Sequence, residues 1–325
     1  HYRPLNGRSL REIARRRAHH GEGRFLNPFG LDRSGRWLNV LSWKLFHRNR
    51  FESDLQHQIV APVSIVCEGV GRPTGLSLTF LKHASLMIQD AGRRLLIDPV
   101  FDSPFWFMRD FTPLDFDPSR MPAPDHVLIT HGHYDHLDTA SLARLPPDTH
   151  VVSPPGYSDV LDEAGLGRRT ALDWFEGFRD GDREIILLPC HHWTMRNPVA
   201  GPNRGLWGSY LIRTASGPTI YISGDTAYFD GFDQIGAEFD IDLAVFNLGA
   251  YEPRWFMAPS HIDPAETVRA FRELRAKKLM IVHWGTFQLG DEPVYLPPQH
   301  LREEMQKAGL LSRLVECRHG ETLEV

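Results

Sequence analysis

Short apolar runs recur along the chain from residue 76 onward, and each has the length of a β-strand. The first three cover 76–81, 85–89 and 94–97, and Ala91 and Gly92 before the third are typical of a hairpin turn. Later runs cover 126–130, 149–152, 183–188, 209–213, 219–223, 243–246 and 279–282. The early strands are therefore expected to pair as antiparallel hairpins, with helices between some of the later ones.

The clearest helix start lies at Asp263. Asp263 fits the N-cap position, Pro264 the first helical position and Glu266 the third, which is the pattern of a capping box. The apolar residues that follow at three-residue spacing, and predict one buried face, are Val268, Phe271 and Leu274. Hairpins followed by strands that alternate with helices fit two helix-covered sheets better than one parallel sheet. We therefore expect an α+β sandwich.

The composition is that of a globular chain with a sizeable core. Hydrophobic residues make up 42% of the 325 residues and charged residues 24%, which excludes a disordered or fibrous protein. No apolar run approaches the roughly 18 residues that a membrane-spanning helix needs. The formal net charge of −5 argues against a general nucleic-acid binder. Cys67, Cys190 and Cys317 make neither a disulfide framework nor a Cys-x-x-Cys metal knuckle.

The N-terminal segment differs from the rest in charge. Residues 1–50 hold twelve Lys or Arg and three Asp or Glu, whereas the whole chain holds 36 and 41. Trp37, Trp43 and Phe46 add aromatic side chains, and a basic, aromatic segment is typical of an interfacial membrane anchor. The alternative is an extension that packs over the acidic main domain. We predict an N-terminal extension over 1–74, on or beside the core, and a main domain over 75–325.

The segment 130–138 reads THGHYDHLD and directly follows an apolar strand. Four candidate metal ligands fall within six residues: His131, His133, Asp135 and His136. They cannot share one helix face, because positions i and i+2 point about 200° apart on a helix. A loop at the end of a strand can fold them around a cation. Imidazoles with a carboxylate suit zinc, with manganese or iron as alternatives.

Three other predicted strands also lead into candidate ligands. These are His191 and His192 after 185–188, Asp225 after 219–223, and His283 after 279–282. Polar residues at separate strand ends can converge at one rim of a sheet sandwich, and a dinuclear site needs about this many ligands. Neighbours on a strand face opposite sides, so only one of the two adjacent histidines is expected to bind a metal.

Further motifs carry a family resemblance. They are GRFLNP (23–28), LIDPVF (96–101), HW (192–193), LWGS (206–209), GAYEPRWFM (249–257), HIDP (261–264) and HWGT (283–286). With the ligand motifs, they resemble the metallo-β-lactamase superfamily and, within it, the N-acylphosphatidylethanolamine-hydrolysing phospholipase D branch with its RomA-like bacterial members. The resemblance covers nearly the whole chain. It implies an αββα sandwich with a dinuclear site at one edge of the two sheets.

The same resemblance assigns the candidate ligands to two zinc ions, with manganese or iron as alternatives. His131, His133 and His192 would hold one ion, Asp135, His136 and His283 the other, and Asp225 would bridge both. His192 is preferred over His191 because the family has a histidine directly before Trp193. Two cations bridged in this way lower the pKa of a shared water and can take up charge on a phosphoryl oxygen.

The resemblance also implies residues around the metals. His261 matches a family histidine that would orient the substrate or donate to the leaving oxygen, and with Asp135 it is a candidate catalytic residue. Asp98, at a strand end, and His83, in a position where the family has Gly-His-Ala, are predicted to support the metal ligands from behind. His191 is a third candidate for such a supporting role.

The candidate substrate contacts are large apolar side chains in predicted loops, together with an arginine that could meet a phosphate: Trp106, Phe107, Arg254, Trp255 and Phe256. Apolar loops of this kind either line a lipid-accepting surface or pack under the N-terminal extension. The sequence does not decide between these two interpretations.

The resemblance therefore implies a dinuclear zinc phosphodiesterase that cleaves N-acylphosphatidylethanolamine to N-acylethanolamine and phosphatidic acid. The alternatives are a lactonase or soluble phosphodiesterase of the same fold, and a membrane-surface protein without catalysis. The expected partners are a phospholipid and no nucleic acid. Peripheral membrane association and a homodimer are left open, as is the cellular compartment.

Overall fold

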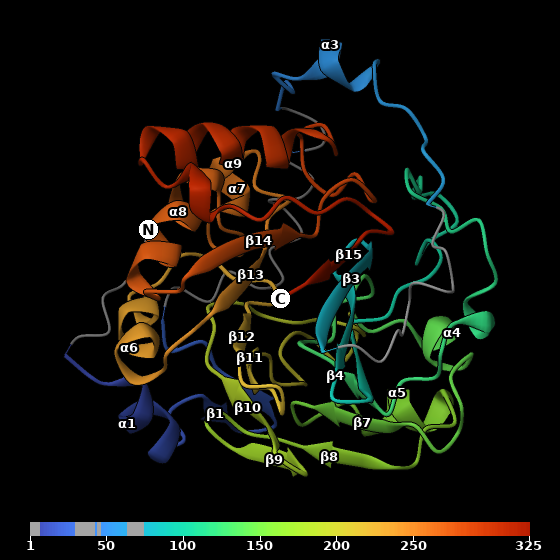
Figure 1. Cartoon of the computed structure of the whole chain (residues 1–325), viewed down its shortest axis with the longest axis vertical. Coiled ribbons are helices and arrows are strands. Elements are labelled where there is room, and N and C mark those ends of the chain that lie inside the picture. Colours follow the sequence, from blue (N-terminus) through green and yellow to red (C-terminus); the bar gives the residue numbers. More distant parts are fainter. Residues whose placement is uncertain (1–6, 30–42, 44–46, 64–74) are drawn as a thin grey trace.

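Two β-sheets packed face to face form the centre of the molecule (Figure 1). The computed structural model describes residues 7–29, 43, 47–63 and 75–325. The larger sheet has the strand order β15-β3-β4-β5-β6-β7-β8. Its strands are β3 (Leu76–Lys82), β4 (Ser85–Asp90), β5 (Arg93–Ile97), β6 (His126–Leu128), β7 (His150–Ser153), β8 (Arg169–Ala171) and β15 (Thr322–Glu324). Strands β15, β3, β4 and β5 pair antiparallel, as expected for the early hairpins, and β5 to β8 pair parallel.

The second sheet has six strands in the order β14-β13-β12-β11-β10-β9. They are β9 (Gly177–Asp180), β10 (Arg183–Leu188), β11 (Ser209–Arg213), β12 (Thr219–Ile222), β13 (Leu243–Asn247) and β14 (Lys278–Val282). Strands β9 to β12 pair antiparallel, and β12 to β14 pair parallel. Every strand expected from the apolar runs is present, whereas β8, β9 and β15 were not predicted.

Helices cover the outer faces of both sheets (Figure 1). On the six-stranded side lie α6 (Gly231–Glu238), α8 (Pro264–Glu273) and α9 (Leu296–Lys307), and on the seven-stranded side lie α4 (Thr139–Leu142) and α5 (Ser158–Glu163). Shorter elements are α1 (Leu10–Arg15), the hairpin of β1 (His20–Gly21) and β2 (Arg24–Phe25), α3 (Glu52–Leu55), α7 (Arg254–Met257), and two 3-10 turns, Pro118–Arg120 and Leu311–Arg313. The layers confirm the αββα sandwich.

Helix α8 begins as the sequence predicted. The Asp263 side chain accepts a hydrogen bond from the Glu266 backbone N–H at 2.8 Å, and the Glu266 carboxylate accepts one from the Asp263 N–H at 3.2 Å. Val268, Phe271 and Leu274 are buried in the main core. The capping box therefore fixes the direction in which the chain leaves the loop before α8, and that loop includes His261.

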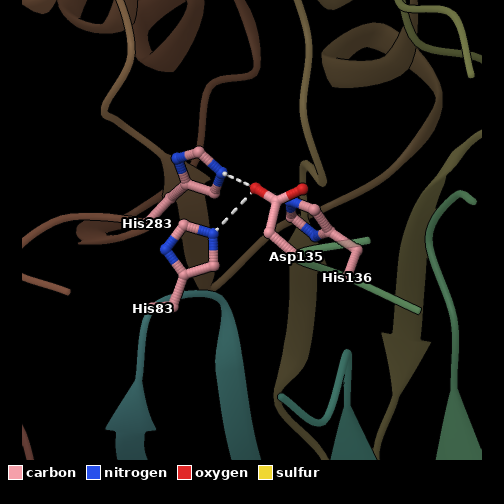
Figure 2. A group of neighbouring side chains, drawn as sticks. All are labelled: His83, Asp135, His136 and His283. Carbon is pink, nitrogen blue, oxygen red and sulfur yellow. Dashed lines mark hydrogen bonds and ion pairs between the residues drawn. The ribbon is translucent and has the colours of Figure 1, made fainter. Parts of the chain in front are cut away.

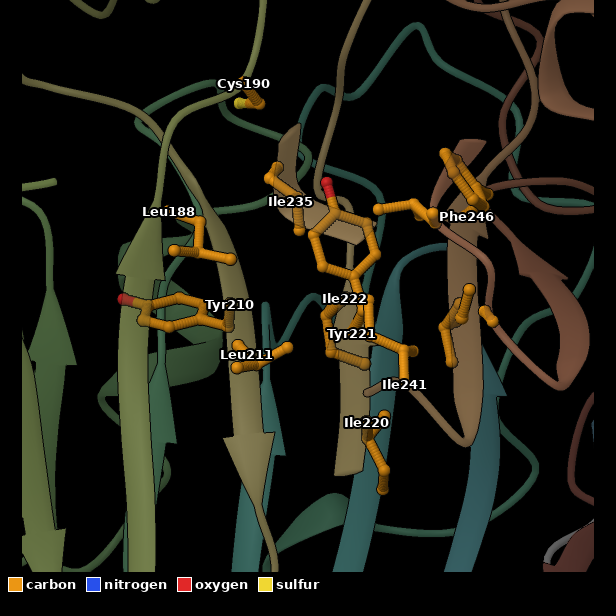
Figure 3. Close-up of a cluster of buried hydrophobic side chains, with 14 of the residues drawn as sticks. Leu188, Cys190, Tyr210, Leu211, Ile220, Tyr221, Ile222, Ile235, Ile241 and Phe246 are labelled. Atoms are coloured by element: carbon orange, nitrogen blue, oxygen red, sulfur yellow. The ribbon is translucent and has the colours of Figure 1, made fainter. Parts of the chain in front are cut away.

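The core has two layers that use opposite faces of the seven-stranded sheet. Leu78 and Phe80 of β3 face the six-stranded sheet, whereas Leu81 belongs to a second cluster that packs under α4 and α5. Figure 3 shows part of the main cluster on the six-stranded sheet, including Tyr210 and Tyr221. The buried Tyr210 hydroxyl donates a hydrogen bond of 2.9 Å to the carbonyl of residue 129, and so connects the two sheets beside the predicted metal loop.

The described part of the N-terminal extension contacts the main domain at several places, among them two hydrophobic clusters. Leu10, Ile13 and Phe29 belong to the main hydrophobic core, and the Leu10 N–H donates to Gln234 Oε1 at 2.8 Å. Trp43 is buried in a smaller cluster and donates to Asp291 Oδ1 at 2.9 Å. Residues 30–42, 44–46 and 64–74, which include Trp37 and Phe46, lie outside the described residues. Among the described helices, none is long and apolar enough to cross a bilayer.

Candidate metal centre

The candidate ligands meet at one edge of the sandwich because the relevant strands end there. In the six-stranded sheet, β10, β12 and β14 run in the same direction and lead to His192, Asp225 and His283. In the seven-stranded sheet, β6 leads into the loop 129–138, which is called the metal loop below. Each sheet therefore supplies part of one constellation.

The first donor group consists of His131, His133, His192 and Asp225, whose ligand atoms all lie within 4.8 Å of one another. His131 Nε2 lies 3.0 Å from His133 Nδ1, and His192 Nε2 lies 3.2 Å from that same nitrogen. Asp225 Oδ2 lies 3.8 Å from the Nε2 atoms of His131 and His192. The three imidazoles that the sequence assigned to one metal therefore converge.

The second donor group consists of His83, Asp135, His136 and His283 (Figure 2). Asp135 Oδ2 lies 3.0 Å from His83 Nε2, 3.5 Å from His283 Nε2 and 3.6 Å from His136 Nε2. Asp225 reaches this group with its other oxygen, because Oδ1 lies 3.3 Å from the Nε2 atoms of His136 and His283. Asp225 therefore presents one carboxylate oxygen to each group.

The spacing of these atoms fits a divalent cation of the zinc type. Two nitrogens bound to zinc at about 2.1 Å in a tetrahedron lie roughly 3.4 Å apart, close to the separations of 3.0 and 3.2 Å in the first group. In the second group the buried Nε2 atoms of His136 and His283 contact the carboxylates of Asp225 and Asp135 at 3.3 to 3.6 Å and form no hydrogen bond of good geometry among the described residues. A cation between these atoms would satisfy the nitrogens better than such long contacts do.

Burial and charge set the protonation of the site. Burial holds the pKa of His131 and His192 well below 6.5 and lowers the pKa of His133 to about 4, so these rings are neutral. Burial alone would raise the pKa of Asp225, but the neighbouring His136 and other imidazoles hold it well below 3.8. Neutral imidazoles and an ionised carboxylate are the forms that bind metals.

His136 differs from the other imidazoles of the site. Burial alone would lower its pKa, but the carboxylates of Asp225 and Asp135 raise it well above 6.5. The ring therefore carries a proton between two carboxylates, and a cation bound there would displace it. Metal uptake at this group is expected to release a proton.

Asp98, a predicted supporting residue, contacts both His136 and the start of the metal loop. Its Oδ2 accepts hydrogen bonds from His136 Nδ1 at 2.8 Å and from the Thr130 hydroxyl at 2.6 Å, and its Oδ1 accepts one from the Thr130 N–H at 2.8 Å. A carboxylate on Nδ1 fixes the ring so that Nε2 faces the site. Asp98 thus holds both the start of the metal loop and one donor on it.

His83, predicted to support the ligands from behind, lies within the second donor group itself. It is buried in the turn between β3 and β4, and its Nε2 contacts the Asp135 oxygen that also faces His136 and His283 (Figure 2). Burial and the neighbouring His283 lower its pKa to about 3. The neutral ring can hold Asp135 in place or act as a ligand itself.

The His191 side chain belongs to neither donor group. Only its backbone N–H contacts a residue next to a candidate ligand. Its ring lies 6.3 Å from the ring of Phe29 in the N-terminal extension, and burial lowers its pKa to about 4. Its backbone N–H donates to Thr226 Oγ1 at 3.1 Å, next to Asp225. The alternation of neighbours therefore turns His192 into the site and His191 toward the extension.

His261 lies at the open side of the centre. Its Nδ1 is 3.8 Å from Asp225 Oδ2, and its ring centroid is 5.5 Å from that of His192. Its side chain keeps 17% of its surface exposed, whereas the side chains of His192 and Asp225 are almost fully buried. Burial lowers its pKa to about 4, so the ring is neutral. His261 is therefore placed to contact a substrate that approaches the metals.

Arg254, a candidate for a contact with phosphate, is engaged in contacts within the protein. Its guanidinium donates to Glu266 Oε2 at 2.7 Å and to the carbonyl of His261 at 2.9 Å, and it lies 3.3 Å from Asp263 Oδ2. These contacts occupy the side chain and hold the loop that carries His261. A sequence motif does not show which of its charges are paired, and these contacts favour a structural role for Arg254.

The aromatic candidates lie in two different environments. The Phe256 ring packs 5.1 Å from the ring of Trp43 in the smaller cluster, so Phe256 lies under the N-terminal extension. Trp255 is exposed, and its indole N–H lies 3.4 Å from His47 Nδ1. Trp106 and Phe107 project into solvent. Phe256 therefore packs under the extension, whereas a lipid-accepting surface stays a prediction for the exposed residues Trp106 and Phe107.

Two asparagines that the sequence analysis missed also fix the centre. Asn247 Nδ2 donates to Asp225 Oδ1 at 2.9 Å, and Asn27 Nδ2 donates to the carbonyl of His192 at 2.9 Å. Asn247 could have been found from the sequence, because it is a polar residue directly after the apolar run 243–246. Asn27 lies 165 residues from His192, and only its place in the GRFLNP motif marked it.

Comparison with known proteins agrees with this architecture. A family model described as a β-lactamase superfamily domain matches residues 93–284. The chain belongs to the β-lactamase superfamily. The matched region begins at β5 and ends just after His283, and so contains every predicted metal ligand.

Relatives within the superfamily include metal-dependent hydrolases. N-acyl-phosphatidylethanolamine-hydrolyzing phospholipase D 1 of Caenorhabditis elegans is 31% identical over 264 residues, which cover 75% of this chain and 74% of that protein. A metal-dependent hydrolase of Pyrobaculum aerophilum is 29% identical over 217 residues, or 66% and 86% of the two chains. The crystal structure of an isothiocyanate hydrolase from Delia radicum gut bacteria superposes with a TM-score of 0.63 at 20% identity over 77% of this chain and 98% of that one, which shows a shared fold.

Proposed function

We propose that this member of a metal-dependent hydrolase family is a dinuclear zinc phosphodiesterase of the phospholipase D type. Its substrate would be N-acylphosphatidylethanolamine and its products N-acylethanolamine and phosphatidic acid. The observation that supports this best is the position of Asp225. Its two oxygens face two separate groups of histidines, at 3.8 and 3.3 Å, which is the arrangement that a bridging carboxylate requires.

The proposed ligands follow from the two donor groups. One zinc ion would be held by His131, His133 and His192, the other by Asp135, His136 and His283, with Asp225 between them. When bound, two such cations lower the pKa of a water molecule between them and stabilise charge on a phosphoryl oxygen. Manganese and iron accept the same donor types.

The chain's own residues would orient the reaction. His261 is partly exposed and close to Asp225, so its ring can hydrogen-bond a phosphoryl or leaving-group oxygen of a substrate at the centre. The loop that carries His261 is held by Arg254 and by a hydrogen bond of 2.9 Å from the His261 N–H to the carbonyl of Met257. Asp98 holds Nδ1 of the His136 ring, so that Nε2 faces both Asp135 and Asp225.

Two observations support a lipid as the substrate. The similarity to the phospholipase of C. elegans extends over three quarters of the chain. In addition, exposed aromatic side chains lie on the loop 105–107, which contacts the metal loop through Phe105 and Tyr134, with ring centroids 5.1 Å apart. A soluble substrate would not require apolar side chains at this place.

The decisive experiment combines metal content with substrate choice. The purified protein should contain about two zinc ions per chain by elemental analysis and should release N-acylethanolamine from N-acylphosphatidylethanolamine in mixed micelles. Turnover of a soluble phosphodiester or a lactone without turnover of the lipid would favour the soluble enzymes of this fold. Full metal content with no turnover of any of these substrates would favour a membrane-surface protein without catalysis.

A further inference from the structure

Three large apolar side chains project into water from two loops beside the metal centre. Trp106 is 96% exposed, Phe107 67% and Val199 96%. We call residues 105–107 the aromatic tip and residues 197–200 the valine tip. The side chains of tryptophan and phenylalanine have a large apolar area, so leaving them in water is unfavourable compared with burying them. Exposure of this kind, concentrated next to an active-site candidate, points to a surface that is covered in use.

The aromatic tip is a built loop. At its base the buried Lys82 ammonium forms an ion pair with Asp110 and donates to the carbonyl of Phe101 at 3.1 Å. Within the loop, the Ser103 hydroxyl is within hydrogen-bond distance of the carbonyl of Met108 at 2.7 Å. These contacts at the base of the loop and across it fix the loop with its tip pointing outward. The exposure of the tip therefore follows from the folded structure.

Both tips connect to the same residue of the metal loop. The ring of Phe105 stacks on Phe107 at 5.3 Å and meets Tyr134 edge-on at 5.1 Å. Tyr134 stands between His133 and Asp135 in the sequence, and its hydroxyl donates to the carbonyl of Arg196 at 2.5 Å. Arg196 lies at the start of the loop that carries the valine tip. The two tips therefore flank the metal loop.

The charge near the tips is basic, although the chain as a whole is acidic. The segments 103–109 and 194–204 contain Arg109, Arg196 and Arg204 and no Asp or Glu. The acidic residues on either side of the first segment are engaged, because Asp102 pairs with Arg144 and Asp110 with Lys82. An apolar tip with nearby arginines complements the anionic headgroups and the apolar interior of a bilayer.

We propose that the aromatic tip and the valine tip insert together into the interfacial layer of an anionic bilayer and bring the metal centre to its lipid. The part of this proposal that concerns the metal centre rests on the proposed lipid substrate. The proposal assigns membrane contact to two loops of the main domain, whereas the sequence suggested the basic N-terminal segment as the membrane anchor. In that segment the described aromatic residues Phe29 and Trp43 are buried against the main domain.

The test is co-sedimentation of the metal-loaded protein with vesicles of phosphatidylcholine and phosphatidylglycerol, compared with vesicles of phosphatidylcholine alone. The Trp106→Ser/Phe107→Ser double variant should partition about tenfold to a hundredfold more weakly than the unmodified protein, because two large apolar groups no longer enter the lipid. Val199→Ser should have a smaller effect in the same direction. Trp106→Phe, which keeps an aromatic ring, should partition nearly as well as the unmodified protein.

Ile59→Ser is the matched control, because Ile59 is an exposed apolar residue in the segment 47–63. It should bind vesicles like the unmodified protein. Thermal denaturation and metal content show whether each variant is folded, so that a loss of partition is assigned to the surface. Addition of salt should weaken binding to the anionic vesicles more than binding to the neutral ones.

Several results would overturn the proposal. Absence of vesicle binding by the unmodified protein would do so, as would equal loss in the double variant and in Ile59→Ser, or no loss in either. A dimer in analytical ultracentrifugation that the double variant converts to a monomer would show that a second copy covers the tips. Binding needs no turnover, so a protein that binds through the tips and leaves N-acylphosphatidylethanolamine intact would refute the proposed function and leave this inference in place.

Discussion

The metal centre and a cluster of His19, His20 and Asp173 contain the same kinds of side chain in different arrangements. In the metal centre, imidazole nitrogens face one another, as with His131 and His133 at 3.0 Å. In the other cluster, each imidazole faces its own carboxylate oxygen. His19 Nε2 lies 2.6 Å from Asp173 Oδ1, and His20 Nε2 lies 2.7 Å from Asp173 Oδ2.

Arg17 adds a second difference. Its guanidinium lies 3.6 Å from Asp173 Oδ2 and 3.3 Å from His20 Nδ1. A cation of the protein thus already neutralises the carboxylate, and a metal ion would have to compete with it. In the metal centre, the described neighbours of Asp225 are imidazoles and Asn247.

The difference teaches that histidines near an aspartate are not sufficient for a metal site. A metal site needs nitrogens that converge on a shared point and a carboxylate that no arginine or lysine already neutralises. Where each nitrogen bonds an oxygen and an arginine completes the charge, the same residues form a hydrogen-bonded ion pair. Here that ion pair attaches the N-terminal extension to the segment after β8.

The largest expected effect comes from Asp225→Ala. This change removes the carboxylate between the two donor groups, so the protein should lose at least one metal ion and should lose more than about a hundredfold in turnover. The matched change in the other cluster is Asp173→Asn, which should leave the metal content at the wild-type value. Elemental analysis and kinetics measure both. Equal metal loss in the two variants would break the comparison.

The adjacent histidines give the next test. His192→Ala removes a donor and should reduce turnover to near background, whereas His191→Ala removes a ring that lies beside Phe29 and should reduce turnover by less than about tenfold. Cobalt substitution gives a second readout, since its absorption bands should change in His192→Ala and not in His191→Ala. The opposite order of effects would show that the wrong histidine has been assigned.

Asn27→Ala should have an intermediate effect. The Asn27 amide donates to the carbonyl of His192, and its loss should weaken zinc retention about tenfold in competition with a chelator. Asn49→Ala is the control, because Asn49 makes the same type of contact, from its amide to the carbonyl of Asp291 at 2.9 Å, away from the metals. If both variants retain zinc equally, Asn27 holds the extension and not the metal site.

The smallest expected effect concerns stability and pH. Burial alone would raise the pKa of Asp173, but hydrogen bonds, first from His19, lower it to about 2. A folded-state pKa below 3.8 means that the ionised carboxylate stabilises the fold above about pH 4, and this contribution disappears as the pH falls toward 2. Asp173→Asn should therefore lower the free energy of unfolding by about 2 kcal/mol at neutral pH.

The dependence on pH distinguishes the ion pair from a packing defect. The difference between the wild-type protein and Asp173→Asn, measured by denaturant unfolding at a series of pH values, should be constant from pH 7 to about 4 and should decrease below that. A difference that does not change down to pH 3 would mean that the carboxylate charge is not its source.

The strands of the core could be predicted because burial imposes continuous apolar runs. All ten of the predicted strands are present, and the capping box located α8 correctly. The missed strands lack this signal. Strand β9 has no buried residue, and β15 has three residues and pairs with β3 from the other end of the chain. Their formation depends on tertiary pairing, which a local pattern does not contain.

The candidate site was predictable where the ligands are close in sequence, as in the metal loop, and where apolar strands end in polar residues. Contacts made by the supporting groups were harder to predict. Arg254 carries the same charge whether it meets a phosphate or, as here, Glu266. Asn27 reaches His192 only because the extension folds against the main domain. Such roles depend on which distant groups are paired, and this follows from the folded structure.

The division of the donors between the two sheets has a consequence for dissected forms of the protein. Strands β3 to β8 and the metal loop end before residue 172, whereas His192, Asp225 and His283 all come later. A chain cut between these parts would leave each fragment with an incomplete set of ligands. Zinc would then bind tightly only to the reassembled pair, so metal affinity would report complementation of the fragments. The C-terminal strand β15, which returns to pair with β3, would add backbone pairing to the packing of the two sheets in that reassembly.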